Sequence, residues 1–225
     1  MPRVKLYNTI SSKGLDCFDR ERYEVGQDLA KPDAILMRSH KLLTSELQES
    51  VRAIARAGAG VNNIPIEACT ERGIPVFNTP GANANAVKEL VAAGMLLASR
   101  DIVGGIAFAR EQDPIMTTAE LNTLMEREKK RFAGAELMGK TLGVVGLGSI
   151  GSLVARLGLD LEMQVVGYDP ALSVEAAWRL PSDVERMDNM QTLLARSDFV
   201  SLHLPVLETT RGLLNADLLK SLRPG

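Results

Sequence analysis

One glycine-rich stretch, residues 143–151 (GVVGLGSIG), has residue types and a spacing that predict chemistry. Gly146, Gly148 and Gly151 lie between a predicted strand at 141–146 and a predicted helix that begins near 150. Gly146 permits a tight turn, Gly148 lets a pyrophosphate approach the backbone, and Gly151 lets the helix pack against the strand. Because the helix N-terminus offers free N–H groups to phosphates, the stretch predicts a dinucleotide site.

Asp169 follows the next predicted strand, at 163–168, about 20 residues beyond the glycines. A carboxylate in this place accepts hydrogen bonds from an adenosine ribose and repels a 2′-phosphate. The spacing therefore predicts NAD rather than NADP. The alternative is a structural glycine turn, with Asp169 as an ordinary solvated acid.

A third strand is predicted at 199–202, and it is followed by His203, Leu204 and Pro205. Strand ends of a parallel sheet line one crevice, so these residues are expected beside the cofactor. A packed histidine at a strand end remains an alternative for His203. We do not expect His203 to be a catalytic acid or base, because nothing near it in the sequence orients the ring.

The elements that position these residues form two βα series. In the first hundred residues, strands are predicted at 4–7, 34–37, 51–57 and 74–77, and helices at 44–47, 65–72 and 85–100. A charged surface helix is predicted at 117–131, and a second series starts at 141. Alternating strands and helices indicate an α/β fold with two doubly wound parallel-sheet domains, Rossmann- or flavodoxin-like, over residues 1–97 and 98–225.

The composition of the 225-residue chain narrows its partners and its location. Its net charge of -2 gives no support for nucleic-acid binding. No apolar run is long enough to span a bilayer, and the N-terminus lacks a secretory pattern, so no membrane partner is expected. Cys17 and Cys69 have no metal-binding or disulfide spacing. We expect a reducing cytoplasm, no metal site, and both cysteines buried.

Five stretches in a fixed order carry a family resemblance: ARAGAGVNNI (55–64), GIPVFNTPGANANAVKEL (73–90), GKTLGVVGLGSIG (139–151), VVGYDP (165–170) and LHLPVLETTRGLLN (202–215). The chain resembles the D-isomer-specific 2-hydroxyacid dehydrogenases, and among them most the phosphoglycerate-specific members. The resemblance implies a substrate-binding domain at 1–97, an NAD-binding Rossmann domain at 98–225 that is incomplete at its C-terminal end, and a cleft between the two domains. It also implies a homodimer through the NAD domain, with residues 101–131 as the dimer arm.

The resemblance implies two sets of contact residues. Cofactor contacts match Ser149, Ile150, Asp169, His203, Leu204, Pro205 and Thr210, and substrate contacts match Arg38, Ser39, Gly60, Val61 and Asn83. The strand pattern agrees, because Arg38, Gly60 and Asn83 follow the ends of three different predicted strands and can converge. The Arg38 guanidinium suits a phosphate or a carboxylate. A surface ion pair for Arg38 and a turn-forming role for Asn83 remain alternatives.

The implied reaction is NAD-dependent hydride transfer from a D-2-hydroxy acid. The substrate implied is 3-phospho-D-glycerate, oxidised to 3-phosphohydroxypyruvate in serine biosynthesis. The family's catalytic Arg, Glu and His come after the turn at 222–225 (LRPG), so we expect no catalytic residue in this chain and an incomplete portion of the enzyme. Alternatives are a glyoxylate/hydroxypyruvate or D-lactate type reductase, and a non-catalytic NAD-binding interaction protein.

Overall fold

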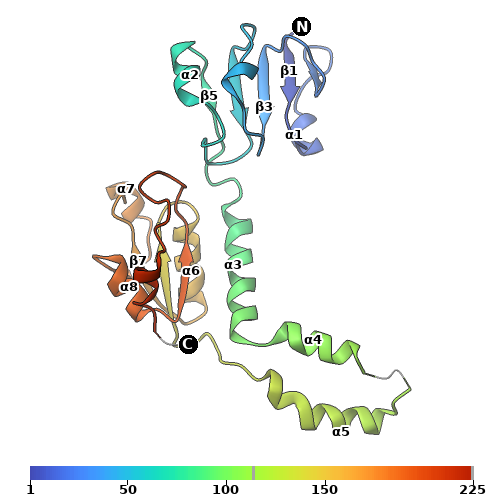
Figure 1. Cartoon of the computed structure of the whole chain (residues 1–225), viewed down its shortest axis with the longest axis vertical. Helices are drawn as coiled ribbons and strands as arrows, with labels where there is room; N and C mark the ends of the chain where they lie inside the picture. Colours follow the sequence, from blue (N-terminus) through green and yellow to red (C-terminus); the bar gives the residue numbers. More distant parts are fainter. Residues whose placement is uncertain (113–114, 224–225) are drawn as a thin grey trace. The chain divides into compact units, whose positions relative to one another are not determined.

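The computed structural model describes residues 1–112 and 115–223, and its contacts divide the chain into two compact units (Figure 1). The first unit is Met1–Asn83 and the second is Ala84–Gly225. This division comes earlier than the boundary expected near residue 97. The reason is helix α3 (Ala84–Ser99), whose buried Met95 packs in the core of the second unit with Leu142 and Val154.

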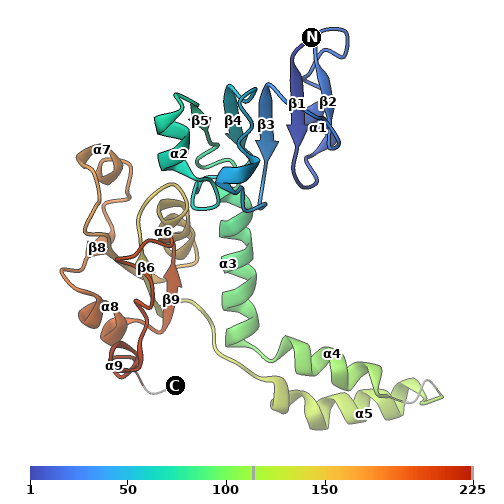
Figure 2. The same ribbon diagram turned by 45° about the horizontal axis from the view of Figure 1, so that its top comes forward.

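The first unit contains a five-stranded parallel sheet in the order β2-β1-β3-β4-β5 (Figure 2). The strands are β1 (Arg3–Leu6), β2 (Glu24–Gly26), β3 (Ala34–Met37), β4 (Ala53–Arg56) and β5 (Val76–Phe77). The helical segments are α1 (Ser12–Leu15), η1 (Thr44–Glu46) and α2 (Ile66–Glu71). This strand order is the flavodoxin-like order. All five carboxyl ends therefore meet at one edge of the sheet.

Burial alternates along the strands of the first unit. Ile35 and Met37 of β3 are buried with Ile54 of β4, whereas the residues between them are half-buried. This period of two directs one face of the sheet into the core. Cys69 of α2 is 1% exposed in that core, but Cys17 is exposed, so the prediction that both cysteines are buried is wrong for Cys17.

The second unit contains a four-stranded parallel sheet in the order β8-β7-β6-β9. The strands are β6 (Thr141–Val145), β7 (Gln164–Tyr168), β8 (Val184–Arg186) and β9 (Phe199–Leu202), and the helices around them are α6 (Gly151–Asp160), α7 (Val174–Ala177), α8 (Met190–Arg196) and α9 (Ala216–Leu219). The chain moves outward from β6 to β8 and then returns to the other side of β6. Such a reversal marks the point where ligands bind to open parallel sheets.

Strand β6 is buried along its whole length because both faces of the sheet are covered. Val144 packs in one core cluster with Val154 of α6, and Val145 packs in another with Leu193 of α8. Successive strand residues point to opposite faces, so the continuous apolar run is explained. The predicted α/β class with two parallel sheets is confirmed.

The segment between the two sheets contains α4 (Ile102–Arg110), α5 (Thr118–Glu128) and η2 (Lys129–Phe132). The predicted charged helix corresponds to α5 and η2. Helix α4 was not predicted; Asp101 caps it by accepting a hydrogen bond from Gly104 N (2.9 Å). Phe108 of α4 and Phe132 of η2 have ring centroids 5.3 Å apart. Residues 113–114 of the predicted dimer arm and residues 224–225 of the LRPG turn lie outside the described residues.

Within the described ranges, no single helix is long and apolar enough to cross a membrane. Helices α3 and α4 meet the length and composition requirement only as a pair that is bent by 69°.

Candidate functional site

The glycine turn is shaped by two glycines that leave no room for a side chain. Gly146 has a φ of 84°, its N–H donates to Tyr168 O (2.9 Å), and an added Cβ would lie 2.6 Å from His203 O. At Gly151 an added Cβ would lie 1.8 Å from Gly146 O. The first residue of α6 therefore packs directly on the turn, as the spacing predicts.

Gly148 differs from both, because no heavy atom lies within 4 Å of an added Cβ. In the described structure, the amides of Gly148, Ser149 and Ile150 donate no hydrogen bond to another protein group. These amides come immediately before α6, where the helix dipole favours an anion. Open space and unpaired donors fit the pyrophosphate of NAD. The Ile150 side chain packs partly against the core, which leaves its amide as the group able to contact phosphate.

Asp169 ties the end of β7 to the glycine turn. Its Oδ2 accepts from Leu147 N (2.8 Å), and its Oδ1 accepts from Ala171 N (2.9 Å). The half-buried carboxylate is thus held in place by two backbone amides. Each carboxylate oxygen has two lone pairs, so acceptor capacity remains for a ribose hydroxyl.

A cavity of about 680 Å³ lies beside Asp169 at the ends of β7 and β8. Its lining includes Leu172, Trp178, Leu180 and Pro181. A concave, largely apolar wall next to a few polar groups is the usual environment of a nucleotide base. Trp178 lines this cavity although it is 86% exposed. The sequence interpretation missed these residues, which come together only in the folded chain.

At the end of β9, His203 has the environment of a packed strand-end histidine. Its backbone N–H donates to Val145 O (2.8 Å), and its Nε2 lies 2.9 Å from Ser201 Oγ. Burial lowers the pKa of His203, which favours the neutral ring. No carboxylate orients the ring in the described structure. This geometry supports a packing role near the turn and gives no support to acid–base catalysis by His203.

The other predicted cofactor residues of this strand end line a second, smaller cavity. Leu204, Pro205 and Thr210 surround about 310 Å³ of space. Thr210 Oγ1 donates to Pro205 O (2.6 Å) and accepts from Leu207 N (2.8 Å). The hydroxyl is thus hydrogen-bonded to the main chain of its own loop.

The strand order places these features in a row along one edge of the second sheet. The glycine turn follows the central strand β6, the Asp169 cavity lies at β7 and β8, and the smaller cavity lies at β9. An extended dinucleotide can therefore place its pyrophosphate on the turn, its adenosine at β7 and its second nucleoside at β9.

The predicted substrate residues lie in the first unit. Arg38 and Ser39 follow β3, and Gly60 and Val61 follow the neighbouring strand β4. Arg56 links the two loops, because its Nε donates to Arg38 O (3.0 Å) and its Nη1 donates to Gly60 O. The Arg56 guanidinium is therefore hydrogen-bonded to two backbone carbonyl groups.

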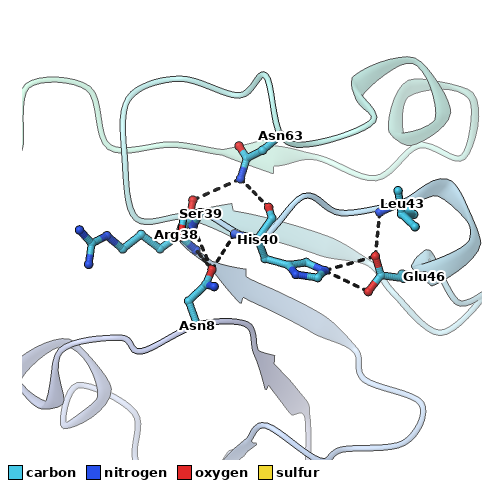
Figure 3. A network of polar contacts seen from close by, with 7 residues as sticks. All are labelled: Asn8, Arg38, Ser39, His40, Leu43, Glu46 and Asn63. Carbon is cyan, nitrogen blue, oxygen red and sulfur yellow. Dashed lines mark hydrogen bonds and ion pairs between the residues drawn. The ribbon is translucent and has the colours of Figure 1, made fainter.

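Two predicted substrate side chains, those of Arg38 and Asn83, take no part in such contacts among the described residues. The Arg38 side chain is exposed, and it forms no ion pair among the described residues, so a surface ion pair does not explain it (Figure 3). Asn83 is the last residue of the first unit, is exposed, and makes no side-chain hydrogen bond in the described part of the chain. The structure thus joins the loops after β3 and β4 and does not tie Asn83 to them.

Comparison with known proteins gives a family for the chain. The profile described as "D-isomer specific 2-hydroxyacid dehydrogenase, NAD binding domain" matches residues 93–225, which is more than half of the chain. Hydroxypyruvate reductase of Thermotoga maritima is 36% identical over 208 residues, covering 91% of this chain and 62% of that protein. D-3-phosphoglycerate dehydrogenase of Methanocaldococcus jannaschii is 36% identical over 197 residues, covering 86% of this chain and 35% of that protein. The chain thus spans 62% of the first relative and 35% of the second, less than two thirds of either.

Solved structures agree in fold. D-mandelate dehydrogenase of Rhodotorula graminis matches 100% of this chain and 72% of its own, with a TM-score of 0.78 and 26% identity. The 3-phosphoglycerate dehydrogenase of Entamoeba histolytica, solved with NAD+ bound, matches 99% of this chain and 68% of its own, with a TM-score of 0.71 and 26% identity. The predicted cofactor, NAD, is confirmed by the family match. The chain belongs to the D-isomer-specific 2-hydroxyacid dehydrogenase family, a family of NAD-dependent oxidoreductases.

Proposed function

We propose that the protein containing this chain oxidises 3-phospho-D-glycerate to 3-phosphohydroxypyruvate with NAD, a reaction of serine biosynthesis. The observation that carries the proposal is the exposed Arg38 guanidinium, which has no described ion partner and follows β3 at the carboxyl edge of the first sheet. A planar guanidinium binds phosphate or carboxylate through two parallel hydrogen bonds. The chain spans 35% of the phosphoglycerate dehydrogenase from M. jannaschii, so the activity proposed is that of the whole protein.

The roles of the residues follow from their positions. The amides of Gly148 and Ser149 bind the pyrophosphate, and Asp169 accepts from the ribose. Bound NAD supplies the acceptor for the hydride that leaves C2 of the substrate. Arg38 and Ser39 bind the anionic substrate, with the loop of Gly60 and Val61 beside them and Asn83 after β5. No residue of this chain is assigned to proton transfer.

The test uses the full-length protein, with NADH formation measured on 3-phospho-D-glycerate, D-glycerate and D-lactate. We expect 3-phospho-D-glycerate to have the highest kcat/KM. Arg38→Ala is expected to raise the KM for this substrate about tenfold or more, because a charge-assisted hydrogen bond contributes roughly 1.5–3 kcal/mol. Arg38→Lys keeps the charge without the fork and should fall between the two. An unchanged substrate KM in Arg38→Ala would remove the basis of the proposal.

A second candidate function is reduction of hydroxypyruvate or glyoxylate. It is favoured by the T. maritima relative, a hydroxypyruvate reductase of which the chain covers 62%, against 35% of the M. jannaschii dehydrogenase. NADH oxidation with hydroxypyruvate, measured in the same preparation, distinguishes the two. NAD binding without turnover of any of these acids would instead support a non-catalytic NAD-binding protein.

We also propose a homodimer that forms through the second unit. Helix α4 exposes Val103 (66%) and Ile106 (48%) within a short segment, and exposed apolar side chains that gather in one place often mark an interface. Light scattering after gel filtration measures the mass directly. A cytoplasmic location is proposed from the free, exposed Cys17, because a reducing compartment keeps such a thiol free.

A further inference from the structure

Two amide side chains form hydrogen bonds with the main chain of residues 38–40, which follows β3, from two sides (Figure 3). On one side, Asn8 Oδ1 accepts from Arg38 N (3.4 Å), Ser39 N (2.9 Å) and His40 N (2.7 Å). On the other side, Asn63 Nδ2 donates to Arg38 O (3.2 Å) and His40 O (2.7 Å). Three consecutive amides thus converge on one oxygen, as in the concave arrangements of backbone N–H groups that bind anions.

Asn8 has a backbone conformation that suits this task. Its φ is 68°, in the left-handed region that asparagine tolerates better than most residues with a side chain. It follows β1, which is the neighbour of β3 in the sheet, and Asn63 lies in the loop after β4, on the opposite side of β3. The loops on both sides of β3 therefore each contribute one amide group to the loop between them.

The downstream end of the loop is held as well. His40 Nε2 pairs with Glu46 Oε1 at 3.0 Å, and the His40 ring stacks on Tyr7 with centroids 4.2 Å apart. Burial raises the pKa of Glu46, but hydrogen bonds from Leu43 N, His40 and Tyr7 outweigh burial, and the net pKa is lowered. Glu46 is thus kept ionised and able to hold His40.

These hydrogen bonds do not involve the side chains of Arg38 and Ser39. Every contact of Asn8 and Asn63 described here is with the main chain, whereas the Arg38 guanidinium extends into solvent (Figure 3). Fixing the backbone reduces the ordering cost when an anion binds, because less conformational freedom is lost at that moment.

We propose that Asn8 is a positioning residue that presents Arg38 and Ser39 to the anionic substrate by collecting the three loop amides, with Asn63 as its counterpart on the carbonyl side. The substrate part of this inference rests on the proposed function. In this proposal Asn8 acts on the substrate only through the loop, because its hydrogen bonds described above are with the main chain of residues 38–40.

The first test needs no activity and uses hydrogen exchange in the 225-residue chain. Asn8→Gly keeps the left-handed backbone accessible but removes the acceptor, and Asn8→Asp keeps an acceptor. We expect exchange of the Ser39 and His40 amides to become about tenfold faster in Asn8→Gly and to return toward the wild-type rate in Asn8→Asp. Lys31→Gly is the matched control, because Lys31 also has a positive φ (52°) but precedes β3 at the amino end of the sheet.

The second test measures kinetics in the full-length protein. Asn8→Gly is expected to raise the KM for 3-phospho-D-glycerate about tenfold, with the KM for NAD unchanged, and Asn8→Asp should restore it. Combining Asn8→Gly with Arg38→Ala should add little to Arg38→Ala alone, because the larger part of the Asn8 effect acts through the Arg38 side chain.

Unchanged amide exchange in Asn8→Gly would overturn the inference, and so would faster exchange with an unchanged substrate KM. Additive effects of Asn8→Gly and Arg38→Ala would show that Asn8 does not act through Arg38. A full-length wild-type protein that oxidises no 2-hydroxy acid would overturn the proposed function, and the exchange experiment would still decide whether Asn8 orders the loop.

Discussion

Two glycines of the dinucleotide motif, Gly146 and Gly148, differ in what an added side chain would change: the stability of the fold at Gly146 and the affinity for NAD at Gly148. Gly146→Ala places a side chain at a φ of 84° and 2.6 Å from His203 O, so we expect a loss of at least about 1–2 kcal/mol in unfolding free energy. Gly148→Ala adds a Cβ in open space, so stability should stay within about 0.5 kcal/mol. NAD affinity should nevertheless fall at least about tenfold, because the Cβ occupies space for the pyrophosphate. Urea unfolding and calorimetric NAD titration measure the two effects, and wild-type NAD affinity in Gly148→Ala would contradict this prediction.

Asp169 determines the choice between NAD and NADP if the carboxylate itself is the group that matters. Asp169→Asn removes the negative charge and one of the two acceptor oxygens that hold Leu147 N and Ala171 N. We expect NAD affinity to fall about tenfold, and NADP affinity to fall less, because the repulsion of the 2′-phosphate is also lost. Titration with both nucleotides tests this, with Asp160→Asn at the far end of α6 as control. An unchanged ratio of the two affinities would exclude Asp169 as the discriminating group.

The buried ring of His203 makes stability depend on pH. Because burial lowers its pKa below the ordinary value of 6.5, the unfolded chain binds the proton first as the pH falls. The contribution of the neutral His203 ring to the free energy of unfolding is fully present above pH 6.5. It is lost as the pH falls from there toward the folded-state pKa. His203→Gln should therefore lose less unfolding free energy than the wild type between about pH 7.5 and 5.5. If the unfolding free energy of the wild type and of His203→Gln depended equally on pH, His203 would not be the group responsible.

At the scale of elements, helix packing rather than helix propensity decides the role of two helical glycines. Gly158 of α6 lies so close to the sheet that an added Cβ would be 2.8 Å from Leu142 and from Val165. Gly94 of α3 has no atom within 4 Å of an added Cβ. Gly94→Ala should therefore stabilise the chain by about 0.5–1 kcal/mol, whereas Gly158→Ala should destabilise it despite the same gain in propensity. Thermal unfolding of both variants checks the opposite signs, and a stabilised Gly158→Ala would show that α6 can move away from the sheet.

Elements were predictable where the sequence pattern was local and long. The strand at Ala34–Met37 and the strand at Phe199–Leu202 were predicted with their observed bounds, because apolar runs flanked by polar residues define them. Strands β2 (EVG) and β8 (VER) were missed, since three residues with one valine carry no periodicity. Their strand conformation depends on pairing with β1 and β7, which is long-range information.

The same distinction applies to the candidate site. The glycine turn and the position of Asp169 after β7 were predictable because their spacing within one βαβ unit is itself the signal. The contacts of Asn8 with residues 38–40 join loops about thirty residues apart in the sequence, and the Asp169 cavity is built from side chains of several elements. Only folding brings these groups together, so no local pattern could have indicated them.

At the scale of the whole molecule, the two units have separate cores. The buried cluster around Ile35 and Ile54 draws on the first unit alone, and the clusters around Val144 and Val145 draw on the second. Cooperative unfolding requires shared buried contacts, so two transitions are expected in calorimetry of this chain. The boundary between the two units lies after Asn83, since α3 contributes Met95 to the second core.

NAD provides the means to assign the two transitions. All the residues proposed to bind the cofactor belong to the second unit, and a ligand stabilises only the unit that binds it, by roughly 2.7 kcal/mol at a concentration 100 times its Kd. Adding NAD should raise the midpoint of one transition and leave the other in place. Gly148→Ala, which weakens NAD binding, should abolish the shift, whereas Arg38→Ala should preserve it. A single transition, or two transitions that move together with NAD, would mean that the units unfold as one body and that the substrate loops are thermodynamically coupled to the cofactor.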